Sequence, residues 1–324
     1  MSAACSDQDF IDSWQRNQSG IKVSKELGVS YTQTLARRRR IEKRYNIQLG
    51  VRDHRPTYNS APYIHEHNAR ISLTIKDAVL PVASDVHVWP GQKTTAQRAY
   101  IEFVKRLKPR YVIMNGDVFD GSRISRHPRI GFLEKRPLVR DELRAVSEFL
   151  TAVEEAAPRG ATFIWTLGNH DARYESYIAQ AAPEMEGVHG MHLKDWFPKW
   201  EPCWSVHINE GTEGYTVIKH RWHNGIHSNY NNALRSGTNF VAGHLHKLDS
   251  TKWVDYRGHR YGVDTGFMSD RDDAQFVHYT EDNPKNWTSG FVVLSFKDGK
   301  LMRPEFVQKW DEDRVEFRGE VVKV

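Results

Sequence analysis

The sequence predicts an α/β protein with a small all-α unit at its N-terminus. From about residue 71, short apolar runs alternate with segments of helical periodicity, as in chains that form a sheet flanked by helices. Residues 1–50 instead show helical patterns only. Between them, residues 51–72 have no clean periodicity and include Pro56 and Pro62, which is typical of a linker. We therefore expect a helical domain over 1–50, a linker over 51–72 and an α/β domain over 73–324.

The composition is that of a globular protein in a reducing compartment. The chain has 324 residues, 39% hydrophobic and 27% charged, and no run approaches the roughly 20 apolar residues that span a bilayer. Residues 1–17 have no basic start and no apolar stretch, so we predict no secretory signal. The two cysteines, Cys5 and Cys203, belong to no spaced set, which argues against a cysteine metal site. A cytoplasmic protein without a membrane partner is expected.

The N-terminal segment combines helical patterns with positive charge. Residues 1–50 hold nine Lys and Arg against five Asp and Glu. A helix ending at Leu27, the turn at Gly28 and a third helix capped by Ser30 resemble a helix-turn-helix unit. We expect the third helix to bind nucleic acid, with DNA as partner, through Arg37, Arg38, Arg40, Lys43 and Arg44. The alternative is a small helical cap with a solvated basic face.

The remaining chain alternates strands and helices. Strands are expected within residues 77–87, 111–120, 161–171, 215–225 and 239–246, and helices over 95–107 and 138–156. In the first of these helices Ala99, Phe103 and Leu107 recur every four residues. The segments 253–266 and 290–301 are typical of antiparallel strands, with a hairpin turn in the sequence KDGK.

Polar residues follow five of the apolar runs, at the place where α/β sheets bind ligands. These residues are Asp85, His87, Asp117, Asp120, Asn169, His170, Asp171, His220, His223, His227, His244 and His246. A glycine precedes Asp117, Asn169 and His244, and would let the backbone bend sharply toward a common centre.

This donor set predicts a metal centre. Imidazole nitrogens and carboxylate oxygens suit Mn, Fe, Zn or Ni, and about seven ligands are too many for one tetrahedral ion. They fit two ions roughly 3.5–4 Å apart, with a carboxylate as the bridge. Of these metals we expect Mn.

The ordered blocks DVH, GDVFD, GNHD, an isolated histidine and GHLH resemble the calcineurin-like metallophosphoesterase superfamily over about residues 75–270. The resemblance implies a four-layer αββα sandwich with a two-metal site at the strand ends. It implies His170 as an acid and phosphate contact outside the metal shell, oriented by Asp171. The ligands that it implies are Asp85, His87 and His246 for the first metal, Asp117 as the bridge, and Asn169 and His244 for the second.

The isolated histidine of the resemblance is either His220 or His223. The sequence HNG resembles the family's His-Gly loop, and a ligand should lie beyond the strand, so we predict His223. The second block also departs from the protein serine/threonine phosphatases of the superfamily, which continue with Arg-Gly. Here Gly121, Ser122 and Arg123 follow, which disfavours a protein phosphatase.

The function that we expect is hydrolysis of a phosphate ester, with a metal-bridging hydroxide attacking phosphorus in line and His170 protonating the leaving oxygen. The basic N-terminus favours DNA, and so does a basic insert after the second block, whose cationic residues are Arg123, Arg126, Arg129, Lys135, Arg136 and Arg140. A looser resemblance to phosphoesterases of bacteriophages and prophages favours a DNA-directed phosphodiesterase or nuclease in the bacterial host cytoplasm.

Two other functions fit the sequence. One is a phosphoesterase for a small molecule, a cyclic nucleotide or a phosphoprotein, with the N-terminal arm used for targeting. The other is a DNA-binding regulator whose phosphoesterase fold is catalytically idle.

Overall fold

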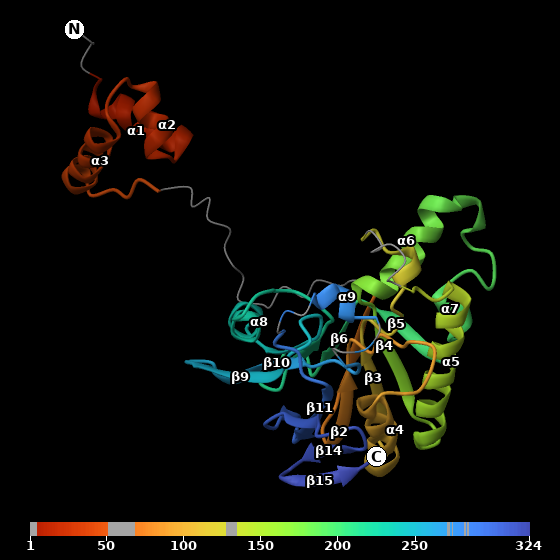
Figure 1. Ribbon diagram of the computed structural model, residues 1–324. Helices are drawn as coiled ribbons and strands as arrows, with labels where there is room; N and C mark the ends of the chain where they lie inside the picture. Colours follow the sequence, from red (N-terminus) through yellow and green to blue (C-terminus); the bar gives the residue numbers. More distant parts are fainter. Residues whose placement is uncertain are drawn as a thin grey trace. The chain divides into compact units, whose positions relative to one another are not determined.

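The computed structural model describes residues 5–50, 69–127, 135–270, 273, 275–281, 283 and 285–324. The chain divides into two compact units, residues 1–64 and 65–324, both drawn in Figure 1. Most of the expected linker 51–72 lies outside the described residues, and its last part belongs to a strand that starts at Arg70.

The first unit is a three-helix cluster formed by α1 (Asp7–Asn17), α2 (Gly20–Glu26) and α3 (Tyr31–Tyr45). Its core contains Phe10 and Trp14 of α1 with Val23 and Ile41 of the other helices. The expected cap of α3 is confirmed, because the Ser30 hydroxyl accepts a hydrogen bond from the backbone N–H three residues later. This unit thus owes its helix boundaries to local signals and its packing to a small aromatic core.

The second unit contains the elements that the alternating sequence pattern predicts. Its helices are α4 (Thr95–Leu107), α5 (Val139–Ala156), α6 (Asn169–Ala181), α7 (Leu193–Trp196), α8 (Ser228–Ser236) and α9 (Val277–Thr280), with 3-10 turns at Ser122–Ile124 and Pro183–Met185. Its strands are β1 (Arg70–Leu73), β2 (Ala78–Ala83), β3 (Tyr111–Asn115), β4 (Thr162–Thr166), β5 (Trp200–Cys203), β6 (Ser205–Ile208), β7 (Thr216–Ile218), β8 (Asn239–Ala242), β9 (Leu248–Asp255), β10 (Gly258–Thr265), β11 (Gly290–Lys297), β12 (Lys300–Leu301), β13 (Glu305–Lys309), β14 (Arg314–Phe317) and β15 (Glu320–Lys323).

The strands of the described residues form two sheets. The first has the order β15-β14-β13-β11-β2-β3-β4-β5, with β12 paired to β11, and the second has the order β1-β6-β7-β8-β10-β9. Strands β2, β3, β4 and β5 run parallel in the first sheet, and β7, β8 and β10 run parallel in the second. The expected antiparallel strands are present as the pairs β9–β10 and β11–β12, and the second pair forms the expected hairpin at KDGK.

The two sheets stack face to face between layers of helix. Leu80, Ile113 and Ile164 of the first sheet share a buried cluster with Val241 and Val263 of the second. Helices α4 and α5 cover the outer face of the first sheet, and α8 packs on β8, β9 and β10 of the second (Figure 1). The expected four-layer αββα sandwich is therefore confirmed. No helix within the described ranges combines the length and apolar character that crossing a bilayer requires.

Candidate metal centre

Side chains from five loops meet where the parallel strands end. Asp85 and His87 follow β2, and Asp117 follows β3. Asn169 opens α6 after β4. His220 follows β7 in the second sheet, and His244 and His246 follow β8. Because the strand ends of both sheets contribute, the site depends on the stacking of the sandwich and not on any single loop.

The backbone at these positions adopts a conformation that side-chain-bearing residues rarely take. Asp85, His87 and Asp117 have φ values of 49°, 42° and 51°, and His244 and His246 have φ values of 74° and 60°. Left-handed backbone at five non-glycine residues costs conformational free energy, and such strain gathers at functional sites. The turns aim each side chain into the space between the loops.

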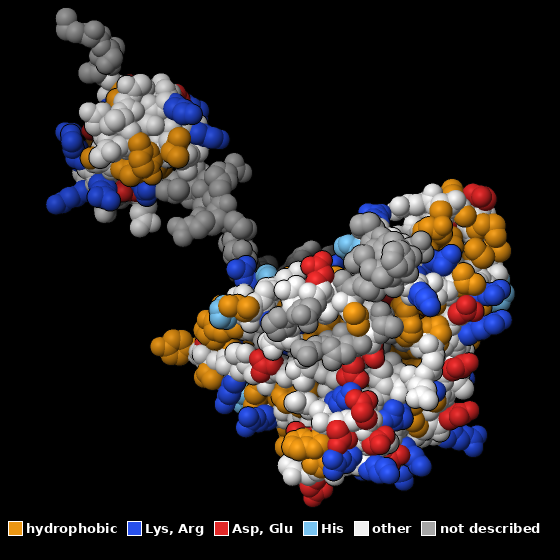
Figure 2. All heavy atoms as spheres, in the orientation of Figure 1, with side chains coloured by type: hydrophobic (Ala, Val, Ile, Leu, Met, Phe, Trp, Pro, Cys, Tyr) orange, Lys and Arg blue, Asp and Glu red, His pale blue; other side chains and the backbone are white. Residues whose placement is uncertain are grey.

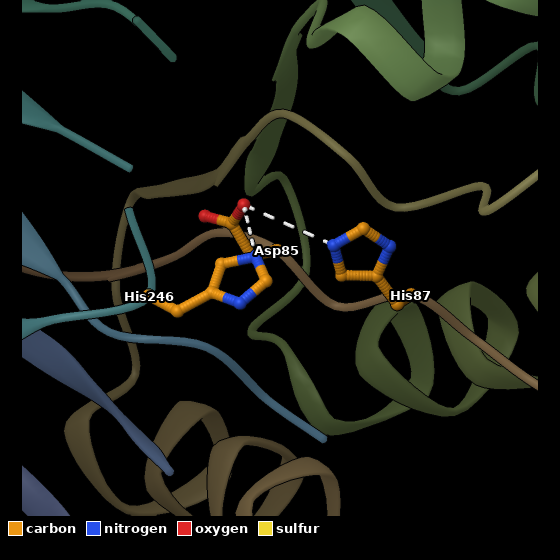
Figure 3. Close-up of side chains that lie close together, drawn as sticks. All are labelled: Asp85, His87 and His246. Atoms are coloured by element: carbon orange, nitrogen blue, oxygen red, sulfur yellow. Dashed lines mark ion pairs between the residues drawn. The ribbon is translucent and has the colours of Figure 1, made fainter. Parts of the chain in front are cut away.

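Asp85, His87 and His246 form the first donor cluster (Figure 3). Asp85 Oδ1 lies 3.2 Å from His246 Nε2 and 3.9 Å from His87 Nε2. The other imidazole nitrogen of His87, Nδ1, lies 2.9 Å from Asp120 Oδ1. This contact fixes the ring so that Nε2 faces Asp85, the second-sphere arrangement that metal-binding histidines usually show.

Asp117, His220 and His244 form the second donor cluster. His220 Nε2 lies 3.1 Å from Asp117 Oδ2, while His220 Nδ1 donates to the Asn115 carbonyl at 2.7 Å. The two clusters are neighbours, because His220 Nε2 also lies 4.0 Å from Asp85 Oδ1. Two adjacent sets of three donors fit two divalent cations.

Several donor atoms of this site are buried without a hydrogen-bond partner among the described groups. They are Asp85 Oδ1, His87 Nε2, Asn169 Oδ1 and His220 Nε2. A buried polar atom left unpaired is costly, so native proteins pair such atoms with protein, water or an ion. Two of these atoms, Asp85 Oδ1 and His220 Nε2, face an ion-pair partner at 3.2 and 3.1 Å, and oxygen and imidazole atoms gathered in this way fit the coordination of divalent cations.

The charges of the buried residues support the same conclusion. Burial lowers the pKa of His220, but the carboxylates of Asp117 and Asp85 outweigh it and raise this pKa to about 10. Burial raises the pKa of Asp85, and the facing His220 and His246 bring it below the usual range of an aspartate. Carboxylates that attract a proton this strongly also attract a metal ion, which must displace that proton to bind the imidazole.

The predicted ligand His223 is not part of either cluster of the described residues, and His220 stands in the second cluster instead. The backbone N–H of His223 donates to Asn232 Oδ1 at 3.1 Å, and its ring lies against Trp222, which in turn packs on Phe240. The choice of His223 rested on the likeness of the sequence HNG to a His-Gly loop and on a ligand position beyond the strand. Because β7 ends at Ile218, His220 is already beyond the strand and occupies the donor position.

The orientation of His170 also differs from the expectation. His170 Nδ1 donates to the Asp120 carbonyl at 2.7 Å and lies 3.4 Å from Asp120 Oδ1. The expected partner, Asp171, instead accepts hydrogen bonds from the backbone N–H groups of Asp117, Val118, Phe119 and Gly168 and from the Trp165 indole. Asp120 therefore orients His170, and Asp171 ties the Asp117 loop to the start of α6.

The glycines that precede the candidate metal ligands allow two loops to approach each other closely, more than they allow the backbone to bend. A Cβ atom on Gly168 would lie 2.0 Å from Asp117 Oδ1, and one on Gly243 would lie 2.6 Å from Asp85 Oδ2. Among the three expected positions only Gly116 has a positive φ, 86°, as a bend requires. The other two glycines let one loop lie directly against the carboxylate of another.

Only part of the basic surface of α3 is free. Arg37 bonds the Cys5 carbonyl and pairs with Asp7, as does Arg44. Arg38 pairs with Glu42 and covers the Trp14 ring. The exposed Arg40 and Lys43 make no ion pair or hydrogen bond to described residues. Figure 2 shows Lys and Arg side chains projecting from the surface of this unit. Of the residues expected to contact DNA, Arg40 and Lys43 are thus exposed and without an ion pair to the described part of the unit.

The chain matches one family model and is similar to several solved structures. The family model for calcineurin-like phosphoesterases matches residues 81–281. Solved structures similar to this chain include a single mutant of Vps29 from Entamoeba histolytica, with 12% identity, a TM-score of 0.39 and coverage of 76% of this chain and 99% of that one. Wild-type Vps29 with Zn²⁺ from the same organism has 15% identity and a TM-score of 0.37, and the match covers 76% of this chain and 98% of that one. A dimetal phosphatase from Danio rerio has 12% identity and a TM-score of 0.34, with coverage of 76% of this chain and 98% of that one. No curated protein matched.

Proposed function

This chain belongs to the calcineurin-like phosphoesterase family and is a metal-dependent phosphate ester hydrolase, and we propose that its substrate is the phosphodiester backbone of DNA. The observation that carries the chemistry is the pair of adjacent donor clusters, with Asp117 Oδ2 and Asp85 Oδ1 both within 4.0 Å of His220 Nε2. Two carboxylates so close to one imidazole, each also facing other histidines, would hold two cations side by side.

The residues that would hold the cations follow from the clusters. Asp85, His87 and His246 would bind one ion, and His220 and His244 the other, with Asp117 between them and the unpaired Asn169 Oδ1 as a further ligand. Bound divalent cations lower the pKa of water and offset the negative charge of phosphoryl oxygens. Among Mn, Fe, Zn and Ni, we propose Mn: the oxygens of Asp85, Asp117 and Asn169 suit Mn, while the four imidazoles also suit Fe, Zn and Ni.

His170 is the proposed proton donor to the leaving oxygen. Burial lowers its pKa, but Asp117 and Asp120 outweigh this effect and raise it to about 9 in the metal-free site. With Nδ1 held by the Asp120 carbonyl, Nε2 points toward the donor clusters, 3.9 Å from Asp117 Oδ2. A general acid needs a proton on the atom that faces the substrate, and this arrangement provides it.

The N-terminal unit supports DNA as the substrate. It has a helix, a turn at Gly28 and a second helix with the exposed cationic residues Arg40 and Lys43, as a helix-turn-helix unit that contacts phosphates would have. The protein would then be a nuclease of bacteriophage origin that acts in the cytoplasm of the bacterial host.

The test is a substrate panel for the full chain loaded with Mn²⁺. We expect hydrolysis of bis-p-nitrophenyl phosphate to exceed that of the monoester, together with cleavage of plasmid or single-stranded DNA. A preference for the monoester without DNA cleavage would instead favour a small-molecule, cyclic-nucleotide or phosphoprotein substrate, with the arm used for targeting. DNA binding without any ester hydrolysis would favour a regulator. Repeating the panel with Fe²⁺, Zn²⁺ and Ni²⁺ identifies the metal that supports turnover.

A further inference from the structure

Arg173 lies beside the proposed acid of the site and is not among the sequence-predicted residues. It follows His170 by three positions on α6, so the two side chains lie on the same face of the helix. Arg173 Nη1 donates to the Asp120 carbonyl at 3.1 Å, the same oxygen that accepts from His170 Nδ1 at 2.7 Å. One carbonyl therefore holds an imidazole and a guanidinium side by side.

The guanidinium of Arg173 is held by hydrogen bonds, but some of its N–H groups make none to described residues. Arg173 Nη1 also donates to the Gly121 carbonyl at 3.2 Å, and these two contacts are its hydrogen bonds to described residues. Its Nε and Nη2 are not among the buried unpaired atoms, so they remain open to solvent. The side chain is partly buried, and Asp120 and Asp117 are the carboxylates that interact with its charge most strongly. A cation held rigidly at the rim of the site, with N–H groups to spare, is suited to bind an anion.

Arg123, the described arginine that directly follows the second block, does not take this place. Arg123, which follows the GDVFD sequence, is exposed and donates to the backbone carbonyl of Arg136. The loop at Gly121 and Ser122 is instead tied to Glu142, which accepts from the Gly121 N–H at 2.9 Å and from the Ser122 hydroxyl at 2.8 Å. The positive charge next to His170 thus comes from α6 and not from the loop.

We propose that Arg173 binds a non-bridging oxygen of the substrate phosphate through its free N–H groups and holds the ester against His170. The proposal rests on the phosphoesterase activity and applies to any phosphate ester, whether or not DNA is the natural substrate. The ligand class is a phosphate mono- or diester anion, and the interaction is a charge-assisted hydrogen bond.

Three variants separate binding of phosphate from support of the loop. Arg173→Gln keeps donors for the Asp120 and Gly121 carbonyls but lacks the charge, Arg173→Lys keeps the charge without the planar fork, and Arg173→Ala lacks both. Arg144→Ala, on the exposed face of α5, is the matched control. Kinetics with bis-p-nitrophenyl phosphate and calorimetric titration with inorganic phosphate are measured on Mn²⁺-loaded protein, and Mn²⁺ affinity is measured separately.

We expect Arg173→Ala and Arg173→Gln to lose about 100-fold in kcat/KM, as removal of one preorganised donor to a reacting oxygen does. The Kd for phosphate should rise at least about tenfold with Mn²⁺ affinity unchanged. Arg173→Lys should lose less, and guanidinium chloride below denaturing concentrations should restore part of the activity of Arg173→Ala. Arg144→Ala should match the wild type.

Wild-type kinetics in Arg173→Gln, or phosphate affinity unchanged in all three variants, would overturn the proposal. Loss of Mn²⁺ affinity in every variant would overturn it as well, because Arg173 would then be a support of the metal site. If the wild type hydrolysed no ester, the proposed function would fail, while the phosphate titration would still decide the role of Arg173.

Discussion

His220 Nε2 lies 3.1 Å from Asp117 Oδ2, although the two residues are 103 positions apart and belong to different sheets. Asp117 follows β3 in the first sheet and His220 follows β7 in the second, so this contact exists only because the sheets stack. The hydrogen bond from His220 Nδ1 to the Asn115 carbonyl locks the same pair of loops together.

The first prediction concerns the choice between two histidines. His220→Ala should weaken binding of the second metal by at least about 100-fold, more than loss of an outer-sphere partner usually does, and should abolish ester hydrolysis. His223→Ala should retain both properties, since its ring lies outside the clusters. Both expectations are checked by measuring the metal content of each variant by atomic emission after dialysis and the ester turnover of the same samples. Equal losses in both variants would contradict the assignment.

The second prediction separates the roles of Asp120 and Asp171. Asp120→Asn removes the charge that orients His87 and keeps the backbone carbonyl that holds His170, so metal affinity should fall by about 10- to 100-fold with little loss of stability. Asp171→Asn replaces an acceptor of five N–H groups and should lower the free energy of unfolding by about 2 kcal/mol or more. Urea unfolding and metal titration of both variants provide the measurements. A stable Asp171→Asn protein would show that its hydrogen bonds are dispensable.

The third prediction concerns close approach at Gly168. A Cβ there would lie 2.0 Å from Asp117 Oδ1 and 2.5 Å from the Asp117 backbone nitrogen, so Gly168→Ala must displace the Asp117 carboxylate. We expect destabilisation of about 1–3 kcal/mol and loss of metal binding. Gly50→Ala is the control, because a Cβ at Gly50 meets no atom within 4 Å. Thermal melting with and without Mn²⁺ tests this, and a metal-dependent stabilisation of Gly168→Ala equal to the wild type's would refute it.

The fourth prediction follows from the buried Glu142. Burial and the nearby Asp120 raise the pKa of Glu142 from 4.5 to about 7. Between these values the native state holds a proton that the unfolded state has lost, so the free energy of unfolding falls as the pH rises from 4.5 to about 7. Relative to Glu142→Gln, the wild type should lose about 3 kcal/mol across this window. Urea unfolding at several pH values measures the difference, and the exposed Glu148→Gln should follow the wild type.

The fifth prediction concerns the surface of the N-terminal unit. Arg40→Ala with Lys43→Ala should weaken DNA binding and reduce the slope of log K against log salt by about 2, one for each lost phosphate contact. The double variant should still unfold like the wild type, because neither side chain pairs within the unit. Arg38→Ala should instead lower stability, because Arg38 pairs with Glu42 and covers Trp14. Fluorescence anisotropy at several salt concentrations is the measurement, and an unchanged slope would exclude this surface.

The features of the fold that could be predicted are those that depend on residues close together in the sequence. The helix over residues 95–107 has the bounds expected from its apolar spacing, and Ser30 caps α3 through a side chain only three residues from its partner. The turn in KDGK has Asp298 and Gly299 both at positive φ, as a tight hairpin requires. The interactions that determine these helix ends and this turn join residues a few positions apart, so they can be recognised from the sequence alone.

The sequence by itself determined the alternation of strands and helices, and the kinds of donor that follow the strands, because periodicity and residue chemistry are local properties. Only the tertiary structure decided that His220 and not His223 faces Asp117, and that Asp120 and not Asp171 holds His170. It alone also placed Arg173 beside that imidazole. Contacts within a few ångströms of a site depend on where each strand stops and on how two sheets stack, and the spacing of residues along the chain does not specify either.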